Sequence, residues 1–140
     1  FRVAALLNGT RVAEGKGQNK KTAEAVAAVE ALRRIKKHQD LCDKIGMSIN
    51  TFSAIIRGKY PTIKKDSILQ ICVGLRLCTM QAEELLNSAG YTLSNAIMTD
   101  VVIKACIYHQ QYNPIAIDRE LQEHGAPPLF PNYKPRYYTI

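Results

Sequence analysis

The feature that most constrains the fold is a run of helical periods that begins near residue 39 and continues to residue 124. Apolar residues recur there at intervals of three and four, between clusters of Gly, Pro, Ser and Asn. This pattern predicts helices over residues 39–46, 49–57, 66–77, 80–88, 94–109 and 115–124. Expected N-caps are Ser48, Asp66, Thr79 and Ser94, and expected stops are Gly46, Gly58, Gly90 and Gly125. The chain is therefore predicted to be mainly α.

Strand signals are confined to the first residues. Residues 1–7 and 10–14 alternate in the manner of short strands, and Asn8-Gly9 between them favours a tight hairpin turn. Residues 20–37 are rich in strong helix formers and follow Asn19, a potential cap. The sequence thus predicts an N-terminal β-hairpin packed on a helix, followed by a helical bundle.

Length and composition exclude some classes of protein. A chain of 140 residues that is 46% hydrophobic can bury a core, in one compact domain or two small ones. No apolar stretch has the length of a membrane span and the first residues do not resemble a signal peptide, so a cytoplasmic chain with no membrane partner is expected. The sequence begins at Phe1, inside a predicted strand, so we expect a further segment ahead of it.

Positive charge is concentrated in the N-terminal part. Residues 1–39 contain nine Lys or Arg against three Glu, whereas the rest of the chain contains ten against nine acidic residues. Such an excess favours a polyanionic partner, because each neutralised phosphate releases condensed counterions. A solvated helix face is the alternative explanation of the same charges.

A basic corner precedes the first predicted helix. Two glycines and three lysines surround its start, where free backbone N–H groups and the helix dipole attract anions. The run EGKGQNKKTAEAVAAVEAL, with the hairpin before it, resembles the C-terminal half of a double-stranded RNA-binding domain. The resemblance implies that duplex RNA phosphates are contacted by Lys16, Asn19, Lys20 and Lys21. Glu24 stands where such domains usually carry a third basic residue, and a structural or dimerising segment remains an alternative.

Residues 39–59 have the spacing of a helix-turn-helix. Gly46 suits the turn, Ser48 can cap the second helix, and Phe52, Ile55 and Ile56 are expected to face inward. The remaining positions are expected to lie outside, where groove contacts are made. The candidate DNA-binding residues are Ser48, Ile49, Asn50, Thr51, Ser53, Ala54, Arg57 and Lys59.

The same frame resembles phage-repressor-like (XRE-type) helix-turn-helix domains, of the kind found C-terminal to bacterial macrodomains. The segments TFSAIIRGK, LLNSAGYTLS and ELQEHGAPPL extend the resemblance. It implies a bacterial DNA-binding transcription regulator, and a homodimer is expected because one module offers little surface for specificity. Weak non-specific nucleic-acid binding and a protein-binding surface are the alternatives.

These observations divide the chain into three parts. Residues 1–37 form the partial double-stranded RNA-binding-like segment, residues 38–125 the repressor-like helical domain, and residues 126–140 an extended arm rich in Pro and Tyr. The compressed first helix of the repressor-like unit indicates that the basic helix substitutes for it and that the two segments share a core. The tyrosine-rich tail of this arm, residues 133–140, is expected to pack back on its own domain, and stacking on bases or docking on a partner are the alternatives.

No catalytic, metal or cofactor site is predicted. The cysteines Cys42, Cys72, Cys78 and Cys106 lack metal-binding spacing, and three of them fit core positions. The acidic residues Asp100, Asp118, Glu120 and Glu123 are interpreted as solvated faces and caps, and His38 as a polar residue that could contact a phosphate. The chain is therefore predicted to bind nucleic acid without catalysing a reaction or binding a small-molecule substrate.

Two rival hypotheses concern the expected upstream segment. In the first, this chain is a non-catalytic interaction or dimerisation module attached to a catalytic domain. In the second, the upstream part is a nuclease such as ribonuclease III, whose RNA-binding domain the first 36 residues resemble.

Overall fold

The computed structural model describes residues 2–7, 10–16, 20–33, 38–58 and 62–135, with side chains from Glu24 onward. The chain is mainly helical, as predicted. Two strands precede seven helices in the described residues: β1 (Arg2–Leu7), β2 (Thr10–Lys16), α1 (Lys20–Leu32), α2 (His38–Ile45), α3 (Ile49–Ile56), α4 (Lys65–Gly74), α5 (Thr79–Ser88), α6 (Met98–Tyr108) and α7 (Pro114–Glu123). None of these helices is long and apolar enough to cross a bilayer.

Strands β1 and β2 pair antiparallel, with Arg2 opposite Lys16 and Leu7 opposite Thr10. The register shifts between Ala5 and Leu6. The predicted turn residues, Asn8 and Gly9, lie outside the described residues. Helix α1 packs against both strands and also contacts α3 and α5, so it joins the strand pair to the helices that follow.

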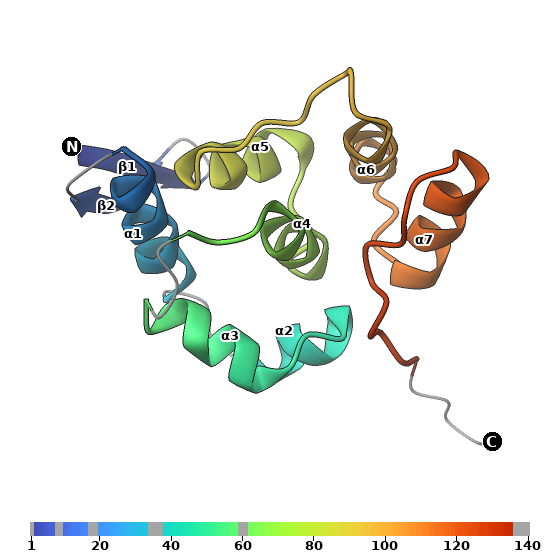
Figure 1. Ribbon diagram of the computed structural model, residues 1–140, viewed down its shortest axis with the longest axis horizontal. Coiled ribbons are helices and arrows are strands. Elements are labelled where there is room, and N and C mark those ends of the chain that lie inside the picture. Colours follow the sequence, from blue (N-terminus) through green and yellow to red (C-terminus); the bar gives the residue numbers. More distant parts are fainter. Residues whose placement is uncertain (1, 8–9, 17–19, 34–37, 59–61, 136–140) are drawn as a thin grey trace.

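Helix α4 lies near the middle of the molecule, with the strand pair and α1 at one end and α6 and α7 at the other (Figure 1). It contacts α2 on one side and α5 on another. Its fully buried side chains include Ile68, Leu69 and Ile71. They belong to one hydrophobic cluster that also contains Val29 and Leu32 of α1.

This continuous core confirms the expectation that the N-terminal helix and the helical region share one hydrophobic interior. Burial of apolar side chains from both parts supplies the driving force that holds them together. The proposed division at residue 37 stays a prediction, because a shared core does not define where a boundary lies.

Glycines end four helices at the predicted positions. Gly46, Gly58, Gly90 and Gly125 have φ angles of 71°, 71°, 84° and 72°, the left-handed conformation that ends a helix without steric cost to glycine. Ser48 caps α3 as predicted, since its hydroxyl accepts a hydrogen bond from the backbone N–H of Asn50 at 3.2 Å.

The other three predicted caps are wrong. Asp66 lies in the first turn of α4, whose N-cap is Lys64, and Thr79 is the first residue of α5, whose N-cap is Cys78. Ser94 precedes α6 by a turn: its hydroxyl accepts from the Ala96 backbone N–H at 3.1 Å, and its own N–H donates to Asp100 Oδ2 at 2.8 Å, whereas the N-cap of α6 is Ile97. Helix α6 therefore begins at Met98 rather than at residue 94.

The C-terminal arm packs on the helices through residues 129–133. The backbone N–H groups of Leu129 and Phe130 donate to Asp118 Oδ1 at 2.8 and 3.2 Å, and both side chains are buried. Gln70 Nε2 donates to the Leu129 carbonyl at 2.7 Å. Of the tail, residues 133–140, which was expected to pack back on its own domain, Tyr133 packs against the hydrophobic core, and residues 136–140 lie outside the described residues.

Candidate nucleic-acid interface

The basic corner lies where β2 ends and α1 begins. Lys16 is the last residue of β2, and Lys20 and Lys21 are the first two residues of α1. The strand register adds a fourth cation, because Arg2 of β1 is paired with Lys16. Asn19 lies outside the described residues. The corner therefore combines a helix start with basic residues from three consecutive elements, a combination suited to phosphate.

Sequence reasoning missed the contribution of Arg2. Its position in the sequence is 14 residues from Lys16, and only the antiparallel register brings the two together. The predicted two-residue turn at Asn8 and Gly9 would place Arg2 opposite Gly15, and the register shift between Ala5 and Leu6 moves its partner by one residue to Lys16. The sequence does not show that shift. The sequence shows that Arg2 is basic, but it does not show which residue lies opposite Arg2 in the strand pair.

From Glu24 to Leu32, where its side chains are described, helix α1 is mostly buried. Ala27 and Ala28 are fully buried and Leu32 is 1% exposed. Glu24, the departure from the expected basic pattern, is also buried, and it faces Gly90, where a Cβ atom would collide with the Glu24 carboxylate. Its charge is therefore directed toward the end of α5, so it does not occupy an exposed RNA-facing position.

Helices α2 and α3 form the two helical parts of the predicted helix-turn-helix, separated by Gly46 and Ser48. Phe52 and Ile55 are buried as predicted, whereas Ile56 is only partly buried. Of the candidate DNA-binding residues, the exposed ones are Ser48, Asn50, Thr51 and Arg57, and Ser53 is partly buried. Lys59 lies outside the described residues.

Two of the outer positions differ from expectation. Ala54 is 5% exposed, so its assignment to a groove-contacting face is wrong, and Ile49 is partly buried against the core. Helix α3 contacts α1 as well as α2, so its buried surface is wider than one apolar stripe. Arg33 strengthens this contact, because its Nε donates to the carbonyl of Ile56 at 2.6 Å.

Charged and polar residues near α3 have specific partners. Arg57 Nε donates to the Ser53 carbonyl of its own helix at 3.2 Å. The His38 ring meets the edge of Phe52 with centroids 4.9 Å apart. Lys65 forms an ion pair with Asp100 at 2.6 Å, whereas Lys64 is exposed. Lys65 is therefore engaged inside the fold and Lys64 presents its charge to solvent.

Two of the acidic residues that were interpreted as solvated faces and caps have structural roles. Asp100, predicted to be solvated, is 2% exposed and accepts bonds from Lys65 and from the Ser94 backbone. Asp118 holds the C-terminal arm. Within the described residues, no group of His, Cys, Asp and Glu is arranged to hold a metal ion.

Three cysteines occupy core positions, as predicted. Cys42, Cys72 and Cys106 are buried and Cys78 is exposed. Burial raises the pKa of the Cys72 thiol to about 12, because the thiolate would lose its hydration. Burial is also the main cause of the raised pKa values of Cys42 and Cys106, with smaller contributions from the charges of Asp43 and Glu120.

Thiol labelling of the native protein should therefore separate Cys78 from the others. At pH 8 we expect Cys78 to react at once with a disulfide reagent, and Cys72 to react roughly a thousandfold more slowly, because it is reached only through opening of the fold. Mass spectrometry of digested samples gives the site of each label, and the Cys78→Ser variant should lack the fast phase. Rapid labelling of Cys72 in folded protein would contradict its placement in the core.

The comparisons with known proteins concern the first part of the chain. A family model for the double-stranded RNA binding motif matches residues 1–35, a segment that holds the strand pair, the basic corner and the whole of α1. No curated protein and no solved structure matches the chain significantly. The resemblance of α2 and α3 to a repressor stays a prediction, because none of these comparisons matches such a domain.

Proposed function

We propose that this chain binds double-stranded RNA through the basic corner formed by Arg2, Lys16, Lys20 and Lys21. The observation that carries the proposal is the match of residues 1–35 to the double-stranded RNA binding motif, with lysines at the start of the matched helix. Such a corner can contact the phosphates of A-form RNA, and these contacts do not distinguish one base from another. Binding would depend on duplex shape and salt more than on sequence.

The packing of α1 supports this proposal. The end of α1 that carries Leu32 is buried against the helical core, so the helix is anchored there, and the opposite end begins at the two lysines. A helix held in this way presents its N-terminus with little loss of conformational freedom on binding.

We further propose that the chain acts by binding and not by catalysis. Two of the acidic residues considered in the sequence, Asp100 and Asp118, accept hydrogen bonds that hold the fold together. A general base needs access to the proton that it removes. The predicted homodimer and the role of non-catalytic module for an upstream domain remain compatible with this proposal.

Reversing the charge of the corner tests RNA binding directly. We expect the Lys20→Glu/Lys21→Glu variant to bind a 20-base-pair RNA duplex about 10- to 100-fold more weakly in 100 mM salt, and to lower the slope of log Kd against log salt by about two. Fluorescence anisotropy of labelled duplex over about 50 to 200 mM salt measures both quantities.

The matched control is the Arg119→Glu/Lys134→Glu variant, which makes the same change in net charge on exposed side chains. Arg119 lies on α7, at the end of the molecule opposite to the strand pair (Figure 1). Equal loss of affinity in the two variants would show that only net charge matters, and the proposed corner would then be wrong.

DNA binding by α3 is a second candidate, favoured by the exposed polar residues Asn50 and Thr51 in the first turn of a helix capped by Ser48. An Asn side chain at such a position can pair with an adenine edge. If the proposal holds, Asn50→Ala should lower affinity for a selected duplex DNA site by about 1–3 kcal/mol while leaving binding to random DNA unchanged.

A pool of random duplex DNA, enriched on the immobilised protein and sequenced, supplies the site for this test. Arg57→Ala is a second variant, expected to cost about 1–3 kcal/mol at the selected site if its guanidinium leaves Ser53 to contact a base. Equal weakening on every sequence would refute base reading, and failure to enrich any sequence would refute site-specific DNA binding.

A further inference from the structure

Every helix from α2 to α7 is followed by a residue in the left-handed conformation, and two of these residues are not glycine. Arg76 follows α4 with φ 54°, and Gln110 follows α6 with φ 57°. The hydrogen bonds are those of a regular helix end, with Leu77 N donating to the Cys72 carbonyl and Gln111 N to the Cys106 carbonyl. Glycine would adopt this backbone without strain, as it does at the other four ends.

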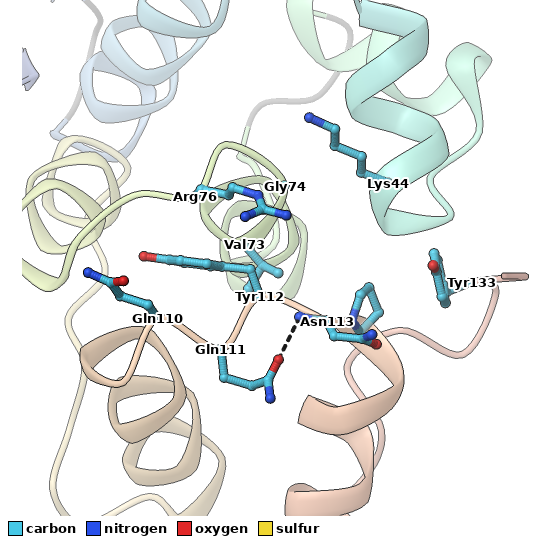
Figure 2. Close-up of a pocket in the computed structure, with 10 residues that line it drawn as sticks. Lys44, Val73, Gly74, Arg76, Gln110, Gln111, Tyr112, Asn113 and Tyr133 are labelled. Atoms are coloured by element: carbon cyan, nitrogen blue, oxygen red, sulfur yellow. Dashed lines mark hydrogen bonds between the residues drawn. The ribbon is translucent and has the colours of Figure 1, made fainter. Parts of the chain in front are cut away.

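The two strained residues line the same cavity. It has a volume of about 350 Å³, within the range of sites that bind small organic ligands. Arg76 comes from the α4–α5 connection and Gln110 from the α6–α7 connection, while Lys44 of α2 and Tyr133 of the arm complete other parts of the wall (Figure 2). Strained backbone that gathers around one cavity indicates that its side chains are required there.

The cavity is positively charged. Lys44 and Arg76 both line it, and no Asp or Glu does so. Among the described residues, neither cation forms an ion pair. Figure 2 shows the Lys44 side chain extending from α2 toward the end of α4 that carries Arg76. Two cations with no ion-pair partner in the described part of the chain form a suitable environment for a ligand with two negative charges.

A tyrosine fixes the geometry of this wall. Tyr112 donates its phenolic hydrogen to the Leu77 carbonyl at 2.7 Å, which joins the α6–α7 connection to the α4–α5 connection. Arg76 lies over the same ring, 5.9 Å from its centroid. Burial is the main cause of the raised pKa of Tyr112, so the phenol stays neutral and provides no countercharge.

Two amide side chains add hydrogen-bond donors. Gln111 Oε1 accepts from the Asn113 backbone at 3.1 Å, and Asn113 Oδ1 accepts from the Ile115 backbone at 2.9 Å. These bonds occupy the oxygen ends of both amides. The amide NH₂ groups are therefore the ends that can donate to an anionic ligand.

We propose that this cavity binds a small phosphate monoester, with the phosphate dianion between Lys44 and Arg76. An arginine fork matches phosphate oxygens in a bidentate manner, and the lysine supplies the second charge. The volume of the cavity exceeds what the phosphate group needs, so the ligand carries an organic group. Its source is either a free mononucleotide or the 5′-terminal phosphate of a nucleic-acid strand.

Calorimetric titration of the full chain with adenosine 5′-monophosphate, at about 50 mM salt, provides the first test. We expect binding of the monophosphate and none of adenosine. A parallel titration compares a short single-stranded oligonucleotide with and without its 5′-phosphate. Binding of the monophosphate identifies a free ligand as sufficient, whereas a 5′-phosphate preference alone identifies a strand end. No binding of the monophosphate and no 5′-phosphate preference would overturn the proposal.

The Arg76→Gly variant makes the test specific, because it removes the backbone strain and also removes the proposed phosphate ligand. Stability should then be kept or increased while ligand affinity falls. This variant should bind the phosphorylated ligand at least tenfold more weakly, while its Tm stays equal to that of the parent or rises. Lys44→Gln should weaken binding as well, and Arg119→Gln is the control that removes an exposed charge outside this cavity.

The outcome that contradicts the proposal is unchanged affinity in Arg76→Gly, or equal weakening in Arg119→Gln. Gly58→Arg provides the converse check on strain, since it places arginine at a left-handed helix end with open space around it. Its Tm should fall. Repeating the titrations in the Lys20→Glu/Lys21→Glu background should leave the monophosphate affinity unchanged, which separates this cavity from the RNA-binding corner.

Discussion

Replacing Asp100 with alanine is expected to lower the free energy of unfolding by about 3–4 kcal/mol, measured by urea denaturation. The carboxylate is 2% exposed and has two bonds that cross between elements. It accepts from Lys65 of α4 at 2.6 Å and from the backbone of Ser94 at 2.8 Å. Removing it leaves the Lys65 ammonium without its partner and releases the turn that precedes α6.

A matched control comes from the exposed ion pair between Lys104 and Glu83. Their side chains are 41% and 40% exposed and lie 3.6 Å apart, so Glu83→Ala should change stability by at most about 0.5 kcal/mol. Asp100→Asn is intermediate, because the amide oxygen can still accept from Ser94 while the charge is lost. If Asp100→Ala is no more destabilising than Glu83→Ala, the buried pair does not hold α6 in place.

The helix ends show how far local sequence determines this fold. Glycine adopts the left-handed conformation easily, so its positions in the sequence indicate helix ends. Helices end where expected at Gly46, Gly58, Gly90 and Gly125. Arg76 and Gln110 adopt the same backbone conformation with no such signal in the sequence. The predicted ranges 66–77 and 94–109 end close to the ends of α4 and α6, but no residue type there indicates the left-handed conformation that follows.

The burial of apolar side chains follows from the sequence more closely than the burial of polar ones. Periodicity places apolar residues on a buried face, and it correctly predicted Phe52, Ile55 and the buried cysteines. It treats every carboxylate as solvated unless a partner is near in the sequence. Asp100 meets Lys65 across 35 residues, and Glu24 lies against Gly90 of a distant helix end. Such pairings depend on how the helices pack.

In the candidate interface, too, some residues follow from local sequence and others depend on how the elements pair and pack. The lysines at the start of α1 were predicted because capping and dipole effects are local. Arg2 joins them only through strand register. On α3, the assumption of a single apolar stripe predicted that Ala54 is exposed. Ala54 is instead 5% exposed, and the helix contacts α1 as well as α2. A helix covered by two neighbours does not follow a single-stripe pattern.

Gly46→Ala should lower the free energy of unfolding by about 2–4 kcal/mol. Roughly 1–2 kcal/mol comes from placing a Cβ atom on a residue with φ 71°. A similar amount comes from displacing the arm, because that Cβ would approach the Tyr133 Cα atom to 2.5 Å and the backbone of Asn132 to 2.8 Å. Backbone atoms cannot rotate aside as a flexible side chain can.

Gly58 allows the two contributions to be separated, since it has the same φ of 71° and no atom within 4 Å of its hypothetical Cβ. Gly58→Ala should therefore cost only the conformational part, about 1–2 kcal/mol. Truncation after Phe130 removes the backbone that the new methyl group of Gly46→Ala would strike, so Gly46→Ala and Gly58→Ala should become equally destabilising in the truncated chain. If their difference persists after truncation, it arises within the turn between α2 and α3. If no difference exists in the full chain, the arm does not pack against that turn.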